Sequence, residues 1–196
     1  MPGGRKYPPR TPRFASGVKS QTVRLSSIRP WWAKRWLAAI EPMSIAGRMS
    51  RGRNYAVSGQ TVGISILPGR VEASVVGTRE KPYSVTLDFA MPDPAAREAA
   101  IREIKAEPMR VARLLADDFP IEIEGILSKA GTRLFPGGRT ADGSYDMKVS
   151  CTCPDWARPC KHAYAVLLLV CEEIARRPLT LLELRGIMEE DLVDED

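Results

Sequence analysis

Three of the four cysteines of this 196-residue chain, together with its only histidine, lie within twelve residues. Thiolate and imidazole are the ligands that zinc prefers, and four of them complete its tetrahedral shell without leaving a position for water. The free energy of binding such an ion is also folding free energy, so the cluster constrains the fold around it. The candidate metal ligands are Cys151, Cys153, Cys160 and His162.

The two ligand pairs, Cys-x-Cys and Cys-x-His, each have a one-residue spacer. In an extended stretch this spacing places both side chains of a pair on the same face. Pro154 and Pro159 restrict the backbone of the loop between the pairs. A helical pattern begins at about Cys160, and the positive end of that helix would favour the Cys160 thiolate.

Other uses of these cysteines fit less well. A disulfide within Cys-x-Cys closes a strained ring, and the basic N-terminus has no apolar stretch of a secretory signal, so we expect a cytoplasmic protein with reduced thiols. A nucleobase deaminase needs Pro-Cys-x-x-Cys, whereas Cys160 is followed by Lys161 and His162. Cys171 lies more than two helical turns beyond His162, and we predict that it is a buried apolar residue and not a ligand.

The run Cys-Pro-Asp-Trp-x-x-Pro-Cys-Lys-His at residues 153–162 resembles a SWIM-type zinc finger in the form common in bacterial members. The resemblance implies a strand–strand–helix (ββα) module with one structural Zn²⁺ ion on the four residues named above. Residues 51–56, 77–83 and 179–186 also resemble bacterial SWIM-finger proteins of this size. Such proteins are often encoded near helicase-like ATPases of the chromatin-remodeller type. The resemblance therefore implies a DNA-associated accessory protein with such an ATPase as a candidate partner, and it implies no enzymatic activity.

The net charge of +5 is distributed unevenly along the chain. Residues 1–53 hold twelve Lys or Arg and one acidic residue, whereas residues 187–196 hold six acidic residues and no basic one. A basic segment on a neutral body is typical of nucleic-acid binding, because cations release the counterions of phosphates. The alternative for the first residues is a solvated arm without a ligand. The candidate nucleic-acid contacts are Arg48, Arg51, Arg53, Arg158 and Lys161.

Hydrophobic periodicity predicts an α+β fold. Apolar residues alternate at Val62, Ile64 and Ile66 and again within residues 71–75 and 83–89, which predicts a small antiparallel β-meander. Helices are predicted after Pro30, after Asp93, after Pro108 and near residues 121–130, followed by a C-terminal ββα finger. We also predict a capping box at Thr180–Glu183 that opens a last helix.

These patterns divide the chain into four parts. We expect a basic disordered arm over residues 1–30, an α+β domain over residues 31–139, the zinc module over residues 140–186 and a mobile acidic tail over residues 187–196. The longest apolar run, Ala163 to Cys171, is under half the length of a membrane span, so we expect no membrane segment.

The tryptophans allow two interpretations. Trp31, Trp32 and Trp36 recur at helical spacing between basic residues, which favours a core stripe over a base-stacking surface. Trp156 lies inside the metal loop, and we predict that it packs against the finger helix, because so small a zinc module needs an aromatic core. The alternative for Trp156 is an exposed stacking platform.

The sequence favours a non-enzymatic zinc-binding module that contacts DNA, a protein or both. The main rival is a pure protein-interaction adaptor that has no nucleic-acid contact. Catalysis is disfavoured because the one histidine belongs to the metal cluster, and the chain has no Walker-type phosphate loop and no Ser/His/Asp set.

Overall fold

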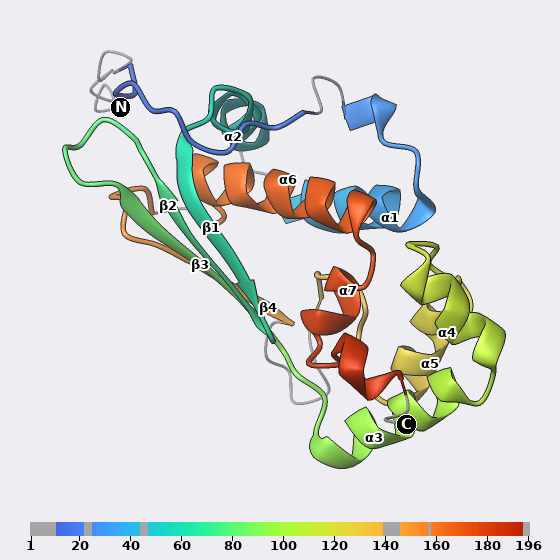
Figure 1. The fold of residues 1–196 in the computed structure, drawn as a ribbon. Coiled ribbons are helices and arrows are strands. Elements are labelled where there is room, and N and C mark those ends of the chain that lie inside the picture. The colour runs from blue at the N-terminus through green and yellow to red at the C-terminus, as the bar shows by residue number, and fades with distance from the viewer. Residues whose placement is uncertain (1–10, 22–24, 44–46, 139–145, 157, 194–196) are drawn as a thin grey trace.

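The computed structural model describes residues 11–21, 25–43, 47–138, 146–156 and 158–193. One four-stranded antiparallel sheet, in the order β1-β2-β3-β4, lies along one side of the molecule (Figure 1). The strands are β1 (Thr61–Leu67), β2 (Arg70–Val75), β3 (Tyr83–Phe89) and β4 (Met147–Cys151). The first three form the predicted meander. The fourth comes from the finger region and pairs with β3, with Cys151 opposite Val85.

The alternation predicted for β2 and β3 is confirmed, since every apolar residue of the two predicted faces is buried. The prediction is wrong for Val62 of β1, whose side chain is 44% exposed. The pairing of β1 with β2 shifts register between Thr61 and Gly63, so Thr61 is buried there and Val62 is turned outward. Ile64 and Ile66 are only half-buried on this edge strand.

The described residues form seven α-helices, together with short 3-10 turns, and these helices lie on one side of the sheet and beyond its end (Figure 1). They are α1 (Trp31–Ile40), α2 (Arg48–Val57), α3 (Pro94–Lys105), α4 (Pro108–Leu115), α5 (Glu122–Lys129), α6 (Lys161–Arg176) and α7 (Thr180–Glu183). The predicted start of α3 is confirmed, because the Asp93 side chain accepts a hydrogen bond from the Ala96 N–H and Pro94 occupies the first turn. The α+β class is therefore confirmed.

The predicted capping box is wrong. Leu179 and not Thr180 occupies the N-cap position of α7, and its side chain makes no capping bond. The Glu183 carboxylate instead forms an ion pair with Arg177 at the end of α6. Thr180 lies within the helix, and its buried hydroxyl has no hydrogen-bond partner among the described residues.

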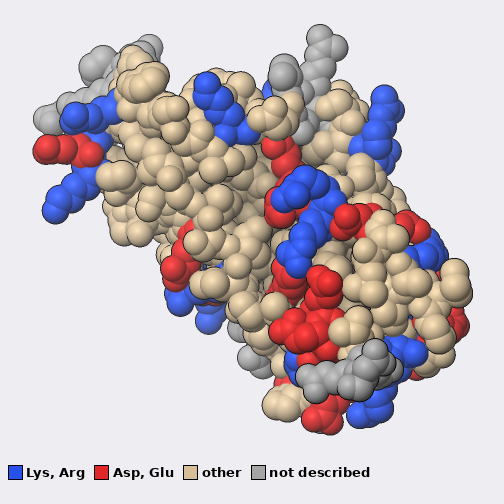
Figure 2. Space-filling view, viewed as in Figure 1, with Lys and Arg blue, Asp and Glu red and all other residues tan. Residues whose placement is uncertain are grey.

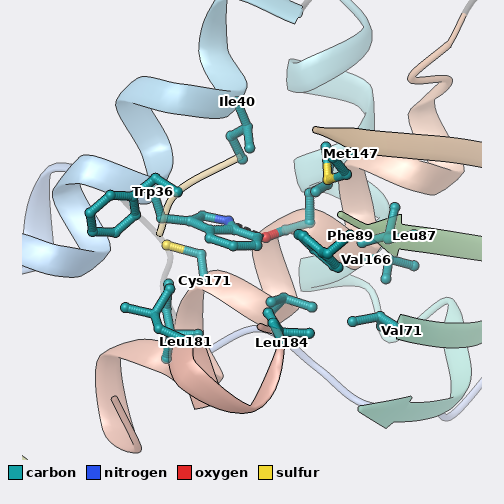
Figure 3. Packing of buried hydrophobic residues seen from close by; sticks show 14 of the residues in the cluster. Trp36, Ile40, Val71, Leu87, Phe89, Met147, Val166, Cys171, Leu181 and Leu184 are labelled. Atoms are coloured by element: carbon teal, nitrogen blue, oxygen red, sulfur yellow. Dashed lines mark hydrogen bonds between the residues drawn. The ribbon is translucent and has the colours of Figure 1, made fainter. Parts of the chain in front are cut away.

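Helix α6 is the central helix of the molecule. It lies between the sheet and helices α1 and α2 (Figure 1), and it contacts β1, β3, β4 and α7 as well. Figure 3 shows Trp36 of α1, Leu87 and Phe89 of β3, Val166 of α6 and Leu184 pointing into one shared core. The core interpretation of the tryptophan stripe is confirmed for Trp36, which is fully buried and donates its indole N–H to the Leu167 carbonyl.

The segments at the two ends of the described chain contact the body. In residues 11–21, Arg13 N–H donates to the Gly77 carbonyl, and Val18 forms a β-bridge with Thr61. At the other end, Leu192 is buried and Asp191 forms an ion pair with Arg97. Residues 1–10 of the predicted arm and 194–196 of the predicted tail lie outside the described residues.

A buried ion pair joins the C-terminal segment to the far end of the sheet. Arg185, fully buried after α7, donates two hydrogen bonds to the carboxylate of Asp146, at 2.9 and 3.0 Å. It also donates to the Ala90 carbonyl at 2.8 Å. Asp146 directly precedes β4, so this pair fixes the strand that carries the first metal ligand.

None of the described helices is both long enough and apolar enough to cross a bilayer.

Candidate metal centre

The four predicted ligands meet at the end of the sheet where α6 begins. Cys151 is the last residue of β4, Cys153 follows in the loop, Cys160 is the N-cap of α6, and His162 lies in its first turn. All four are buried, and their ligand atoms lie within 4.8 Å of one another. A strand and a helix of the same sheet-and-helix core therefore position the whole cluster.

The distances within the cluster fit a zinc ion. The Nδ1 atom of His162 lies 3.8 Å from the Cys151 Sγ and 3.7 Å from the Cys160 Sγ. Zinc bonds of about 2.3 Å to sulfur and about 2.0–2.1 Å to nitrogen in a tetrahedron place these atoms roughly 3.6 Å apart. The structure therefore assigns Nδ1, and not Nε2, as the metal-facing nitrogen. Four protein ligands would leave a bound zinc ion with a structural role.

The electrostatics of the cluster favour thiolates. A hydrogen bond from the Cys151 thiol, together with those from His162 and the Ala163 N–H, lowers the pKa of Cys160 well below its usual range. The same hydrogen bond and burial raise the pKa of Cys151, and burial raises that of Cys153. Without a cation one thiolate is therefore favoured and further ones are costly, and a divalent cation removes this cost because it stabilises all three.

Two tyrosine rings from outside the finger hold His162. Tyr55 of α2 lies edge-on to the imidazole with the ring centroids 5.1 Å apart, and Tyr83 of β3 lies 4.5 Å away at an interplanar angle of 34°. Among the described residues, the buried Nε2 atom has no hydrogen-bond partner. Metal-bound histidines usually donate that second N–H to a fixed acceptor. Here aromatic packing orients the ring instead.

Gly77 completes this enclosure. A Cβ atom at Gly77 would lie 2.4 Å from the Tyr83 ring and 3.3 Å from His162 Nε2, so no larger residue fits without displacement. Tyr55, Tyr83 and Gly77 were not among the predicted site residues. They could have been identified from the sequence, because they lie in residues 51–56 and 77–83, two of the stretches that resemble bacterial SWIM-finger proteins.

Helix α2 reaches the site through a close helix–helix contact. A Cβ atom at Gly52 would lie 2.4 Å from the Cβ of Tyr164 and 2.8 Å from the Lys161 carbonyl oxygen of α6. The absence of a side chain lets the two helices approach and brings Tyr55 against His162. Gly52 is therefore a positioning residue of the metal centre.

An ion pair with α2 holds the loop between the two ligand pairs in place. The Arg48 guanidinium forms a bidentate ion pair with Asp155, at 3.0 and 3.2 Å. Arg158 donates to the Cys151 carbonyl at 3.0 Å and also to the Asp155 carbonyl. Arg48, predicted as a nucleic-acid contact, is only 9% exposed, and its side chain fastens the metal loop.

The prediction that Trp156 packs against the finger helix is wrong. Its side chain is 80% exposed, and the Arg48 guanidinium lies over its ring at 5.4 Å from the centroid. The prediction assumed that the finger needs an aromatic residue of its own. The structure shows that Tyr55 and Tyr83 supply the aromatic packing from α2 and β3.

Of the remaining predicted nucleic-acid contacts, Arg158 and Lys161 lie beside the metal centre, and Arg51 and Arg53 lie on α2. Arg51 is exposed and Arg53 half-buried on α2, Arg158 is exposed in the metal loop, and Lys161 lies with its Nζ 5.1 Å from the centroid of the Tyr55 ring. Arg79 was not among the predicted contacts, because the loop at residues 77–83 was interpreted as a solvated hairpin in preference to a phosphate-facing loop. Its guanidinium lies 5.9 Å from the centroid of the Tyr83 ring.

Two further expectations concern the finger itself. Cys171 is fully buried, and burial raises its pKa to about 12, so the prediction of an apolar role is confirmed. Among the described residues of the finger region, one strand, β4, precedes α6. The strand that pairs with β4 is β3, which precedes the finger in the chain.

Comparison with known proteins agrees with this geometry. Residues 144–171 match the family model of the SWIM zinc finger. The uncharacterized protein Rv2102 of Mycobacterium tuberculosis (strain ATCC 25618 / H37Rv) is 32% identical over 187 residues, which cover 95% of this chain and 66% of that protein. The chain thus spans just under two thirds of the length of this relative. No solved structure matches significantly. The chain therefore contains a SWIM zinc finger, and this finger brings together Cys151, Cys153, Cys160 and His162.

Proposed function

We propose that this protein is a non-enzymatic module that binds nucleic acid, DNA above all, through a surface that one structural zinc ion holds in shape. The observation that supports this proposal most is the arrangement of cations around the metal centre. We call this surface the basic end and define it by six residues. They are Arg13, Arg51, Arg53, Arg79, Arg158 and Lys161.

Cations of the basic end lie beside the residues that surround His162. Lys161 and Arg79 lie over the Tyr55 and Tyr83 rings that hold His162, and the backbone of Arg13 bonds to Gly77 at the same place. Figure 2 shows basic side chains at the upper left, with acidic atoms between them, where the loop between β2 and β3 lies in Figure 1; more acidic side chains gather, among basic ones, over α7 and the C-terminal segment. The charge separation favours one end of the molecule for a polyanion.

The chemistry of this end suits phosphates. Arginine and lysine side chains bind phosphate oxygens without reading bases, and each contact releases a counterion. The bidentate pair with Arg48 neutralises Asp155 at the edge of this surface. We therefore expect binding with little sequence preference and a steep dependence on salt concentration.

In this proposal the zinc ion would stabilise the fold of the binding surface and would take part in no reaction. With four protein ligands, the ion would have no open position for a substrate or a water molecule. The residues of this chain then do the rest. Tyr55 and Tyr83 orient His162, Gly52 brings α2 against α6, and Arg48 fixes the loop that presents Arg158.

The test is a titration of labelled DNA with zinc-loaded protein at several salt concentrations. The double variant Arg51→Gln/Arg53→Gln should weaken binding to every sequence alike, and it should lower the slope of log affinity against log salt by about two units. The matched control removes the same charge at the other end of the molecule. Arg102→Gln/Arg113→Gln, both exposed on α3 and α4, should bind as the unmodified protein does. Absence of binding at the lowest salt concentration would contradict the proposal.

A second candidate function, a protein-interaction adaptor, is favoured by a groove beside the edge strand β4. The groove has a volume of about 760 Å³, and its lining includes apolar residues as well as Arg158 of the basic end. The apolar residues are Pro42, Met43, Pro136, Met147 and Val149. Grooves beside a strand edge accept extended peptide segments. A helicase-like ATPase is the partner that the sequence resemblance suggests, and co-purification of the two proteins with Met43→Asp as the disrupting variant tests this candidate.

A further inference from the structure

We propose that Trp156 is a base-stacking platform and that the preferred ligand of the basic end is a single-stranded nucleic acid. This inference rests on the proposed function, and it deepens that function by naming the form of nucleic acid. It assigns a binding role to a side chain that contributes little to the core and is no metal ligand.

The exposure of Trp156 differs from that of the other tryptophans. Trp32 and Trp36 are buried, and their indole N–H groups donate to the carbonyls of Ile174 and Leu167. The indole N–H of Trp31 donates to the Phe119 carbonyl. The Trp156 side chain is 80% exposed. An exposed indole is unfavourable in water, so it is a signal of binding where its surroundings fix it in place.

The surroundings of Trp156 do fix it. Its loop is closed at both ends by metal ligands, Cys153 and Cys160, and Asp155 beside it is held by the bidentate pair with Arg48. The same Arg48 guanidinium covers the ring at 5.4 Å from its centroid. A cation on one side of an indole leaves the other side for a second flat partner, and little side-chain entropy remains to be lost on binding.

The geometry favours an unpaired base as that partner. Each base of a duplex is already stacked on both faces, whereas a base of a single strand can be placed on an aromatic ring between cations that hold its phosphates. Arg158 lies two residues from Trp156, and Arg51 lies one helical turn from Arg48 on the same side of α2. These cations provide the charge that a nucleic-acid backbone needs next to the stacked base.

The first measurement compares affinities of zinc-loaded variants for a single-stranded oligonucleotide and for a duplex of the same sequence. Stacking of one base contributes about 1–3 kcal/mol, so Trp156→Ala should weaken single-strand binding by about 5- to 150-fold. Trp156→Phe should restore most of the affinity, and duplex binding should change by less than about twofold. Met109→Ala, which truncates another exposed apolar side chain away from the basic end, is the control. DNA and RNA oligonucleotides in parallel identify the sugar that is preferred.

The second measurement uses the indole itself. Acrylamide should quench Trp156 far more than the three tryptophans of α1, and saturation with an unlabelled single strand should remove this quenchable fraction. Equal single-strand affinities of Trp156→Ala and the unmodified protein, or an unchanged quenchable fraction at saturation, would overturn the inference while leaving the proposed function intact. Absence of binding to single strand and duplex alike would overturn both.

Discussion

The environment of His162 shows how single residues define the metal centre. Its Nδ1 atom faces the sulfur atoms, and its other edge meets Gly77 and the rings of Tyr55 and Tyr83. The ring orientation therefore depends on shape and not on a second hydrogen bond. The absence of a side chain at Gly77 therefore helps to keep His162 in this orientation.

Gly77→Ala tests this dependence. The new methyl group would lie 2.4 Å from the Tyr83 ring and 3.3 Å from His162 Nε2, so one of the two rings must move. We expect the free energy of unfolding to fall by about 1–3 kcal/mol, as for other overpacked sites, and zinc to dissociate more readily in a competition with a chelating dye.

Gly63→Ala is the matched control for this variant. A Cβ atom at Gly63 of β1 meets no atom within 4 Å, so stability and zinc affinity should remain close to those of the unmodified protein. Equal zinc affinity and stability in the Gly77 and Gly63 variants would refute the view that packing orients His162.

Contacts between elements connect the finger to the rest of the fold. Helix α2 crosses α6 at Gly52, and Arg185 connects the segment after α7 to Asp146 at the start of β4. Each contact joins residues that are distant in sequence. The finger is thus held on one side by a helix and on the other by a buried ion pair.

Gly52→Ala should separate α2 from α6. The added Cβ atom would lie 2.4 Å from the Tyr164 Cβ, which cannot move without its helix. The gain in helix propensity, about 0.5–1 kcal/mol, should be outweighed by overpacking of about 1–3 kcal/mol, giving a net loss of stability in urea unfolding. In the control variant Gly125→Ala on α5, the new Cβ would have no atom within 4 Å, so the stability should rise by the gain in helix propensity alone. A stabilised Gly52 variant would show that the helices are not in this contact.

Arg185→Met should be strongly destabilising. It would leave the carboxylate of Asp146, whose side chain is only 2% exposed, without its ion-pair partner, and breaking a buried pair costs about 3–5 kcal/mol. The exposed pair between Arg102 and Glu98 serves as the control, because Arg102→Met should change stability by less than about 1 kcal/mol. Similar losses in the two variants, measured by thermal unfolding, would contradict the assigned importance of the buried pair.

At the scale of the whole molecule, the metal centre and the core are one structure. The ligands Cys160 and His162 begin α6, and the apolar face of that helix contacts α1 and the sheet. Figure 3 shows the same helix contributing Val166 and Cys171 to the core that holds Trp36. Loss of the metal should therefore affect residues far from the ligands.

Chelation of zinc should expose the tryptophans of α1. Trp36 donates its indole N–H to Leu167 of α6, so its fluorescence reports on a region outside the finger. In a Trp156→Phe background, which removes the exposed indole, we expect a chelator to shift the emission to longer wavelength in a single transition that coincides with the loss of helical circular dichroism. An unchanged emission after complete zinc removal would show that the core does not depend on the metal.

The parts that local chemistry determines could be predicted from the sequence. The ligand cluster, the alternation of β2 and β3 and the Asp93 cap each depend on neighbouring residues. Val62 was predicted wrongly because a register shift in the pairing of β1 with β2 moves it outward. Such a shift depends on the partner strand, which the local pattern does not report.

The parts that depend on distant contacts could not be predicted in this way. Arg48 looked like a surface cation, yet its partner Asp155 is 107 residues away. Trp156 was expected to be buried because the finger was treated as a separate small module, whereas α2 and β3 supply its aromatic residues. The predicted boundary near residue 139 stays a prediction, although the sheet continues across it from β3 to β4.

The most direct test of the account is the metal content of the purified, reduced protein, read by elemental analysis and by the absorption spectrum after cobalt replaces zinc. We predict one zinc ion per chain and a cobalt spectrum of tetrahedral thiolate ligation. Cys153→Ser should lose both signals, and Cys171→Ala should keep them, since Cys171 is buried away from the cluster. A folded, reduced protein without zinc, or a Cys153→Ser variant that binds the metal as the unmodified protein does, would contradict the account.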